Sequence, residues 1–146
     1  MLDERLAQHG TARVVGEPFD GDDAAPVGVG GDLRTSKCAV STVDGVCRVE
    51  KQASVISYGA YTDDILVTAR REESAAPGDQ SIFLVRRDQC DLEKVSGWDT
   101  LGMRATESNG FVLRATFSPE QILPAPFADV ASQTMVAYSH VLWTGA

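Results

Sequence analysis

The residues best suited to contact a ligand lie close together near the middle of the chain. From Ser57 to Tyr61 the sequence places a hydroxyl group, two aromatic rings and a glycine in quick succession. Hydroxyl and aromatic side chains can hydrogen-bond to a planar ligand or stack on it, and a glycine lets the backbone come close to its edge. The segment Tyr58–Asp63 is therefore expected to be a loop suited to the edge of a planar ligand.

Two predicted strands position this loop. Lys51–Ser57 precedes it and Asp64–Ala69 follows it. Both contain the β-branched and large apolar residues that are typical of pleated, half-buried surfaces. The polar, aromatic segment between them predicts the turn.

The rest of the chain from Ser36 to Phe117 also has β character. Asp44–Gly45 predicts a two-residue type I′ turn between two strands. Short antiparallel strands joined by tight turns favour a mainly β fold, a closed or nearly closed antiparallel β-barrel. The other predicted strands are Thr11–Val15, Lys37–Thr42, Val46–Ala53, Ser81–Arg86, Leu92–Val95 and Gly110–Phe117.

Two further segments differ from the strands. Gly16–Leu33 is rich in Gly, Pro and Asp and predicts a long surface loop. Phe127–Gly145 has apolar residues at helical spacing and predicts a C-terminal helix. This helix either begins a further helical domain, leaving Val141 and Trp143 without buried partners in this chain, or folds back on its own barrel.

The composition limits the class of protein. A chain of 146 residues is one domain's worth, and its net charge of −8 argues against a nucleic-acid surface, which needs clustered Lys and Arg. No apolar run approaches the roughly 18 residues that a membrane-spanning helix needs. The acidic, polar start of the chain is unlike a signal peptide. We therefore expect a cytoplasmic protein with no nucleic-acid or membrane partner.

The cysteines and histidines do not suggest a catalytic or metal site. If Asp44–Gly45 closes the hairpin, Cys47 faces Thr42 and Cys38 faces Lys51, so these two cysteines, like Cys90, are expected to be reduced thiols. Histidine occurs only at His9 and His140, without a neighbouring nucleophile or metal-ligand spacing. No catalytic residue and no metal ligand is predicted.

Two blocks of sequence resemble one known family. Val55 to Gly59, followed by Thr62–Asp63, is similar to the flavin-domain motif "K-x-W-I-T-N-G-x-x-A-D" of the acyl-CoA dehydrogenases. Trp98–Pro119 is similar to the "G-x-R-x-S-x-T" segment and the "V-x-V-P" strand of the same family, with Arg104, Thr106 and Ser108 at the Arg-Ser-Thr positions. The two blocks also have the order that the family has.

The resemblance implies a domain organisation. Residues 11–123 would be the central β-barrel domain of an acyl-CoA dehydrogenase, which contacts flavin and acyl-CoA. Residues 1–10 would be a lead-in segment, and residues 124–146 a linker and the truncated start of the helical domain. The chain would then be a fragment, and Arg104, Thr106 and Ser108 would hold the start of the following strand and the domain boundary.

The resemblance also implies a cofactor site. Ser57 would occupy the place of the hydroxyl residue near flavin N5, Val55 that of the tryptophan that packs on the ring, and Ile56 would supply a backbone contact. Glu17 and Pro18 match the start of the family's "T-E-P-G-A-G-S-D" loop, although Phe19–Asp20 replaces its small Gly-Ala pair.

The intact protein would be an FAD-dependent oxidoreductase with an acyl-CoA thioester and an electron acceptor as partners, and it could form a homo-oligomer. The catalytic glutamate would lie in the missing helical bundle. The fragment alone is therefore expected to be inactive and to lack FAD, so the sequence leaves open whether this chain is itself an enzyme. Two alternatives remain: a non-catalytic β-barrel module that binds a small apolar ligand, and a degenerate family member kept as an interaction subunit.

Overall fold

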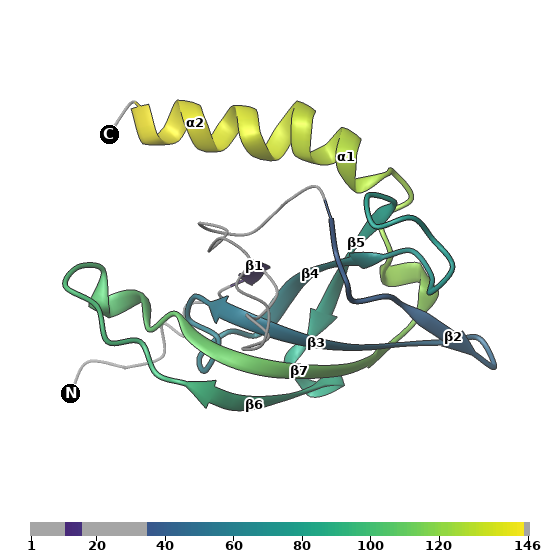
Figure 1. Ribbon diagram of the computed structural model, residues 1–146, viewed down its shortest axis with the longest axis horizontal. Helices are drawn as coiled ribbons and strands as arrows, with labels where there is room; N and C mark the ends of the chain where they lie inside the picture. The colour runs from purple at the N-terminus through teal and green to yellow at the C-terminus, as the bar shows by residue number, and fades with distance from the viewer. Residues whose placement is uncertain (1–10, 16–34, 145–146) are drawn as a thin grey trace, which may run out of the picture.

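The computed structural model describes residues 11–15 and 35–144 (Figure 1). The structure is mainly β, and a helical segment follows the strands. The strands are β1 (Thr11–Val15), β2 (Ser41–Val43), β3 (Val46–Ile56), β4 (Asp64–Arg70), β5 (Gln80–Arg86), β6 (Cys90–Ser96) and β7 (Asn109–Phe117). Short 3₁₀-helices lie at η1 (Arg87–Gln89), η2 (Arg104–Thr106) and η3 (Pro119–Gln121).

The strands form one hydrogen-bonded path in the order β5-β4-β1-β3-β7-β6, and β2 pairs with β3. All pairs are antiparallel except β1 with β4, which run parallel. The mainly β class and the antiparallel sheet are confirmed. Within the described residues the path does not close into a barrel, because β5 and β6 are its two ends. The outer edge of β5 is covered instead by residues 121–123, where Leu123 N donates to Ile82 O at 2.8 Å.

The core lies between the inner faces of the strands. Burial alternates along β3 and β4 as a half-buried strand requires, with Ile56, Ile65 and Val67 fully enclosed. Across the core, the rings of Phe83 on β5 and Phe117 on β7 stack with their centroids 4.4 Å apart. This pair connects β5, one end of the strand path, with β7, which lies next to the other end.

The predicted Asp-Gly hairpin is present. Asp44 and Gly45 both have positive φ (52° and 76°), as a type I′ turn requires, and Cys47 lies opposite Thr42 as predicted. All three cysteines are free thiols. The strand before the turn is shorter than predicted, because the chain from Cys38 to Val40 turns to pair with Arg70 at the end of β4. As a result the Cys38 thiol donates to the carbonyl oxygen of Glu50 and does not face Lys51 across the hairpin.

The helix predicted after Pro126 is present as a single helical segment (Figure 1). It consists of α1 (Phe127–Val130), a π-helical stretch η4 (Ala131–Met135) and α2 (Val136–Thr144). Phe127 and Ala131 are buried against Ile82 and Leu66. Further along, Tyr138 and Val141 are 66% and 68% exposed, so the helix is attached to the sheet through its first turns. None of the described helices has the length and hydropathy to cross a bilayer.

Candidate functional site

The predicted ligand-contacting residues lie at the end of β3. The Ile56 side chain is fully buried in the core, whereas Val55 and Ser57 are half-buried. A bulge between Ala53 and Ile56 breaks the regular pairing with β7, and β1 pairs with β3 at Val55 and Ile56. The Ile56 side chain is therefore closed to a ligand, while Val55 and Ser57 can present their side chains.

The β3–β4 loop continues from this strand end. Tyr58 has a positive φ of 57°, and its backbone N–H donates to Thr106 O at 2.8 Å. The rings of Tyr58 and Tyr61 are 52% and 68% exposed, so each has a free face. A hydrogen bond with Glu107 and that residue's negative charge raise the pKa of the Tyr61 hydroxyl, which stays protonated at neutral pH.

The sequence suggested that Gly59 lets the backbone come close to a ligand, but in the structure it has a different role. It is buried, and an added Cβ would lie 2.8 Å from Cε2 of Phe111 and 3.1 Å from Cγ2 of Ile56. Because Cβ atoms essentially never come that close to another heavy atom, a larger residue would push the loop off the core. The glycine therefore serves close packing of the loop on the core.

Three hydroxyl groups join the β3 end to the β6–β7 loop. Ser57 Oγ lies 2.8 Å from Ser108 Oγ, which lies 2.7 Å from Thr106 Oγ1. Thr106 Oγ1 donates to the Met103 carbonyl oxygen at 2.8 Å. Ser57 and Ser108 are far apart in the sequence, and no local pattern predicted that they would meet.

The β6–β7 loop is organised around that same carbonyl. The Met103 oxygen also accepts from Trp98 Nε1 at 3.0 Å and from Thr106 N at 3.1 Å, and Met103 and Glu107 both have positive φ. Arg104 is exposed and donates through Nε to Thr100 O at 2.7 Å. Arg104 and Thr106 thus make contacts within the loop before β7, and Ser108 links that loop to Ser57. Their expected role at a domain boundary stays a prediction.

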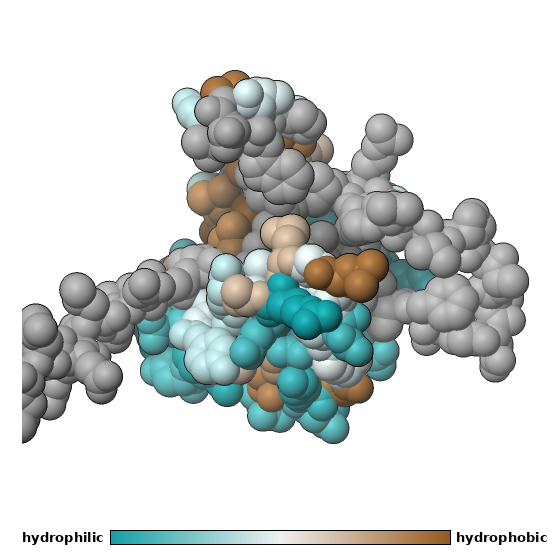
Figure 2. Space-filling model, turned by 90° about the vertical axis from the view of Figure 1, so that its left-hand side faces the viewer, coloured by the Kyte–Doolittle hydropathy of each residue, from teal (hydrophilic) through white to brown (hydrophobic). Residues whose placement is uncertain are grey.

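Figure 2 looks onto the end of the molecule that carries this β6–β7 loop. The surface drawn in colour there carries both hydrophilic and hydrophobic residues. Leu101 and Met103 project into solvent, with Met103 76% exposed. Glu17 and Pro18, the remaining candidate cofactor residues, lie outside the described residues.

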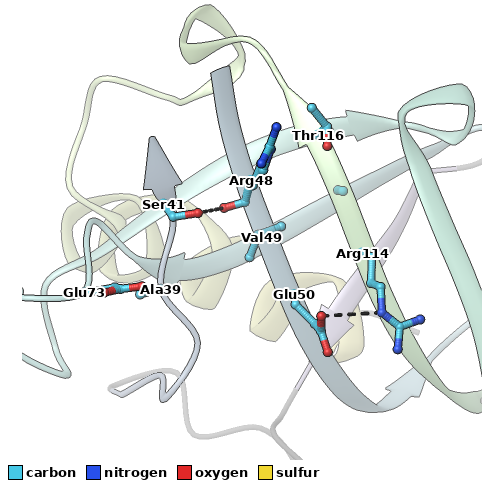
Figure 3. A pocket seen from close by; sticks show the side chains of 9 residues that line it. Ala39, Ser41, Arg48, Val49, Glu50, Glu73, Arg114 and Thr116 are labelled. Carbon is cyan, nitrogen blue, oxygen red and sulfur yellow. Dashed lines mark hydrogen bonds and ion pairs between the residues drawn. The ribbon is translucent and has the colours of Figure 1, made fainter. Parts of the chain in front are cut away.

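Two of the hollows on the part of the chain that the structure describes lie along β3, and neither is lined by Val55, Ile56 or Ser57. The larger, of about 440 Å³, is open and polar and lies over β3 and β7 (Figure 3). There Arg114 pairs with Glu50 at 3.5 Å and, just beyond, with Glu93 at 3.0 Å, which raises the pKa of the guanidinium. Exposed pairs of this kind contribute little to stability, and here they already neutralise the charge of Arg114.

The second hollow, of about 350 Å³, lies beside the bulges of β3 and β6. Ala53, Val95, Phe111 and Val112 give it a largely apolar lining, and Ser54 and Ser96 lie among them. It adjoins the strand end that carries Val55. Sequence reasoning missed this hollow, because it depends on two irregular strands facing each other across β7.

Comparison with known proteins identifies the fold. No family model matches the sequence, and no curated protein matches it. Among solved structures, an acyl-CoA dehydrogenase from Geobacillus kaustophilus matches with a TM-score of 0.62 and 21% identity, over 80% of this chain and 29% of that chain. The fold is that of one part of an acyl-CoA dehydrogenase. The resemblance drawn from the two sequence blocks is therefore confirmed at the level of the fold.

The same fold part occurs in other enzymes. An FAD-dependent dehydrogenase matches with a TM-score of 0.60 and 16% identity, over 80% of this chain and 29% of that chain. The HsaA monooxygenase from M. tuberculosis matches with a TM-score of 0.55 and 18% identity, over 85% of this chain and 27% of that chain. This chain thus spans less than a third of the length of each of these structures.

Proposed function

We propose that this chain is the β-domain of a flavoprotein oxidoreductase of the acyl-CoA dehydrogenase type. The observation that carries the proposal is the fold match, which covers 80% of this chain but only 29% of the Geobacillus kaustophilus enzyme. The intact protein would dehydrogenate an acyl-CoA thioester between its α and β carbons and pass the electrons to an acceptor. It would work in the cytoplasm, and it could do so as a homo-oligomer.

The residues at the end of β3 fit one edge of a flavin. Ser57 is half-buried and its hydroxyl oxygen has capacity for a further hydrogen bond, and Val55 presents a half-buried apolar side chain. Ile56 would supply a backbone contact. FAD, when bound, supplies the hydride acceptor of the reaction. This chain would hold and orient the ring edge, with Glu17 and Pro18 as further candidate contacts.

The contacts of Val55, Ile56 and Ser57 are expected to bind FAD only weakly by themselves. Val55 has less area for stacking than the tryptophan it replaces, and neither hollow encloses the residues that would contact the ring. The proton-abstracting carboxylate would come from a helical domain outside residues 1–146. We therefore propose that this chain alone is inactive and binds FAD weakly or not at all.

An FAD titration of the whole chain tests the proposal. Flavin fluorescence and the melting temperature are followed together, for the wild type and for Ser57→Ala and Ser74→Ala, the latter being a matched loss of a hydroxyl in an exposed loop. The expected result is weak binding of FAD in its oxidised and reduced forms, with Ser57→Ala weakening the binding of the reduced form roughly fivefold, as for the loss of one hydrogen bond. Ser74→Ala should leave it unchanged. FAD that co-purifies at stoichiometric occupancy would contradict the proposal that this chain alone binds FAD weakly or not at all.

A second candidate function is supported by the apolar hollow beside Val95 and Phe111. In that case the chain is a non-catalytic module for a small apolar ligand. Binding of an apolar fluorescent dye that Val95→Asp abolishes, together with no response to FAD in any variant, would favour this function over the first.

A further inference from the structure

The hydroxyl groups of Ser57, Ser108 and Thr106 form a chain whose direction is determined by its last acceptor. A hydroxyl group has one proton to donate, whereas a carbonyl oxygen can only accept. Thr106 donates its proton to the Met103 carbonyl at 2.8 Å. The Ser108 hydroxyl must therefore donate to Thr106 Oγ1, and the Ser57 hydroxyl must donate to Ser108 Oγ.

Burial keeps this direction fixed. Ser108 is 4% exposed, so water has little access to offer its proton another acceptor. The Met103 carbonyl at the far end is held in place by Trp98 Nε1 and by the left-handed backbone of its own residue. Ser57, at the other end of the row of hydroxyl groups, is half-buried. Its oxygen has only lone pairs left for a ligand.

We propose that Thr106 and Ser108 are positioning residues that make Ser57 Oγ a hydrogen-bond acceptor and so select a ligand N–H or O–H group. For the identity of the ligand, this inference rests on the proposed function. Reduced flavin has an N–H at N5, where oxidised flavin has an acceptor nitrogen. If Ser57 lies at that position, the hydroxyl chain favours reduced FAD over oxidised FAD.

The direction of proton donation along the three hydroxyl groups can be tested without flavin. Ser57→Cys places a thiol at the near end, in a background with Cys38→Ala and Cys90→Ala, while Cys47 is 1% exposed and unreactive. A thiolate at position 57 would need a donor, but the Ser108 proton is committed to Thr106. Adding Thr106→Val removes that acceptor, frees the Ser108 proton and stabilises the thiolate.

The measured quantity is the pH dependence of the reaction of this thiol with a thiol reagent. The acid dissociation constant of the thiol should be roughly tenfold higher with Thr106→Val than without it. Thr106→Ser, which keeps a hydroxyl group, should leave it unchanged. Thr106→Ala provides a second loss of the hydroxyl if the valine variant does not fold. Equal constants with and without the Thr106 hydroxyl would overturn the inference.

Titration of the wild-type chain with oxidised FAD, and under anaerobic conditions with reduced FAD, tests the ligand. We expect reduced FAD to bind roughly fivefold more tightly than oxidised FAD, and Thr106→Val to remove this preference. If neither form binds but the thiol result holds, the assignment of reduced FAD as the ligand is overturned and the acceptor role of Ser57 stands. Tighter binding of oxidised FAD that Ser57→Ala abolishes would overturn the preference for reduced FAD.

Discussion

The sheet and the C-terminal helix differ sharply in how they are held. In the sheet, alternate side chains of β3, β4 and β7 enter a shared core, and Phe83 and Phe117 stack across it. The helix is attached through a small cluster in which Phe127 and Ala131 pack against Ile82.

The comparison shows which element of this fold has its apolar face covered and which does not. A layer of structure is stable when its apolar face is covered by another layer. The sheet covers its own inner face, but Tyr138 and Val141 of the helix point into solvent. Of the two, only the sheet has the contacts of a self-sufficient unit. Three sets of substitutions test this difference.

Phe83→Ala should have the largest effect, because Phe83 is 1% exposed and is half of the ring stack that joins β5 to β7. The lost burial and the cavity left behind should lower the free energy of unfolding by about 3–5 kcal/mol. Urea denaturation followed by circular dichroism measures it. Phe83→Leu, which keeps most of the volume, should cost clearly less. Similar losses for both substitutions would show that the cavity is not the cause of the loss.

Phe127→Ala should have a smaller global effect although Phe127 is equally buried. The variant can lose no more stability than the attachment of the helix contributes, because the helix can detach while the sheet stays folded. We therefore expect the free energy of unfolding to fall by about 1–2 kcal/mol. Hydrogen exchange should show faster exchange for residues 127–144 and unchanged protection in β3, β4 and β7. Loss of protection throughout the sheet would mean that the helix is part of the same cooperative unit.

Substitution of Val141 should have the smallest effect on stability, and substitution of the buried Val67 serves as its control. Val141 is 68% exposed on α2, whereas Val67 is fully buried on β4. Val141→Ala should change the free energy of unfolding by less than about 0.5 kcal/mol, and Val67→Ala should lower it by about 2 kcal/mol. Thermal and urea unfolding of both variants measure the difference. A marked loss of stability for Val141→Ala would show that the end of the helix has a covering contact.

Local sequence patterns were sufficient for the strands and their turns. The alternation in β3 and β4, the Asp-Gly pair and the helical spacing after Pro126 each depend on neighbours within a few residues, so their outcome can be predicted from the chain itself. The loop from Tyr58 was predicted for the same reason. Which apolar residues of the helix would be buried was not predictable, because Phe127 and Ala131 are selected by Ile82 on a distant strand.

The sequence by itself therefore determined the mainly β class, the hairpin, the hydroxyl and aromatic residues of the candidate site, and the family whose fold the chain has. Tertiary structure decided the parallel pairing of β1 with β4, the strand path left open between β5 and β6, and the packing of Gly59 on Phe111. It also decided the contact of Ser57 with Ser108, which are 51 residues apart. The physical reason is that hydrogen-bond partners and close contacts between distant segments depend on how strands are ordered in the sheet, and no local period encodes that order.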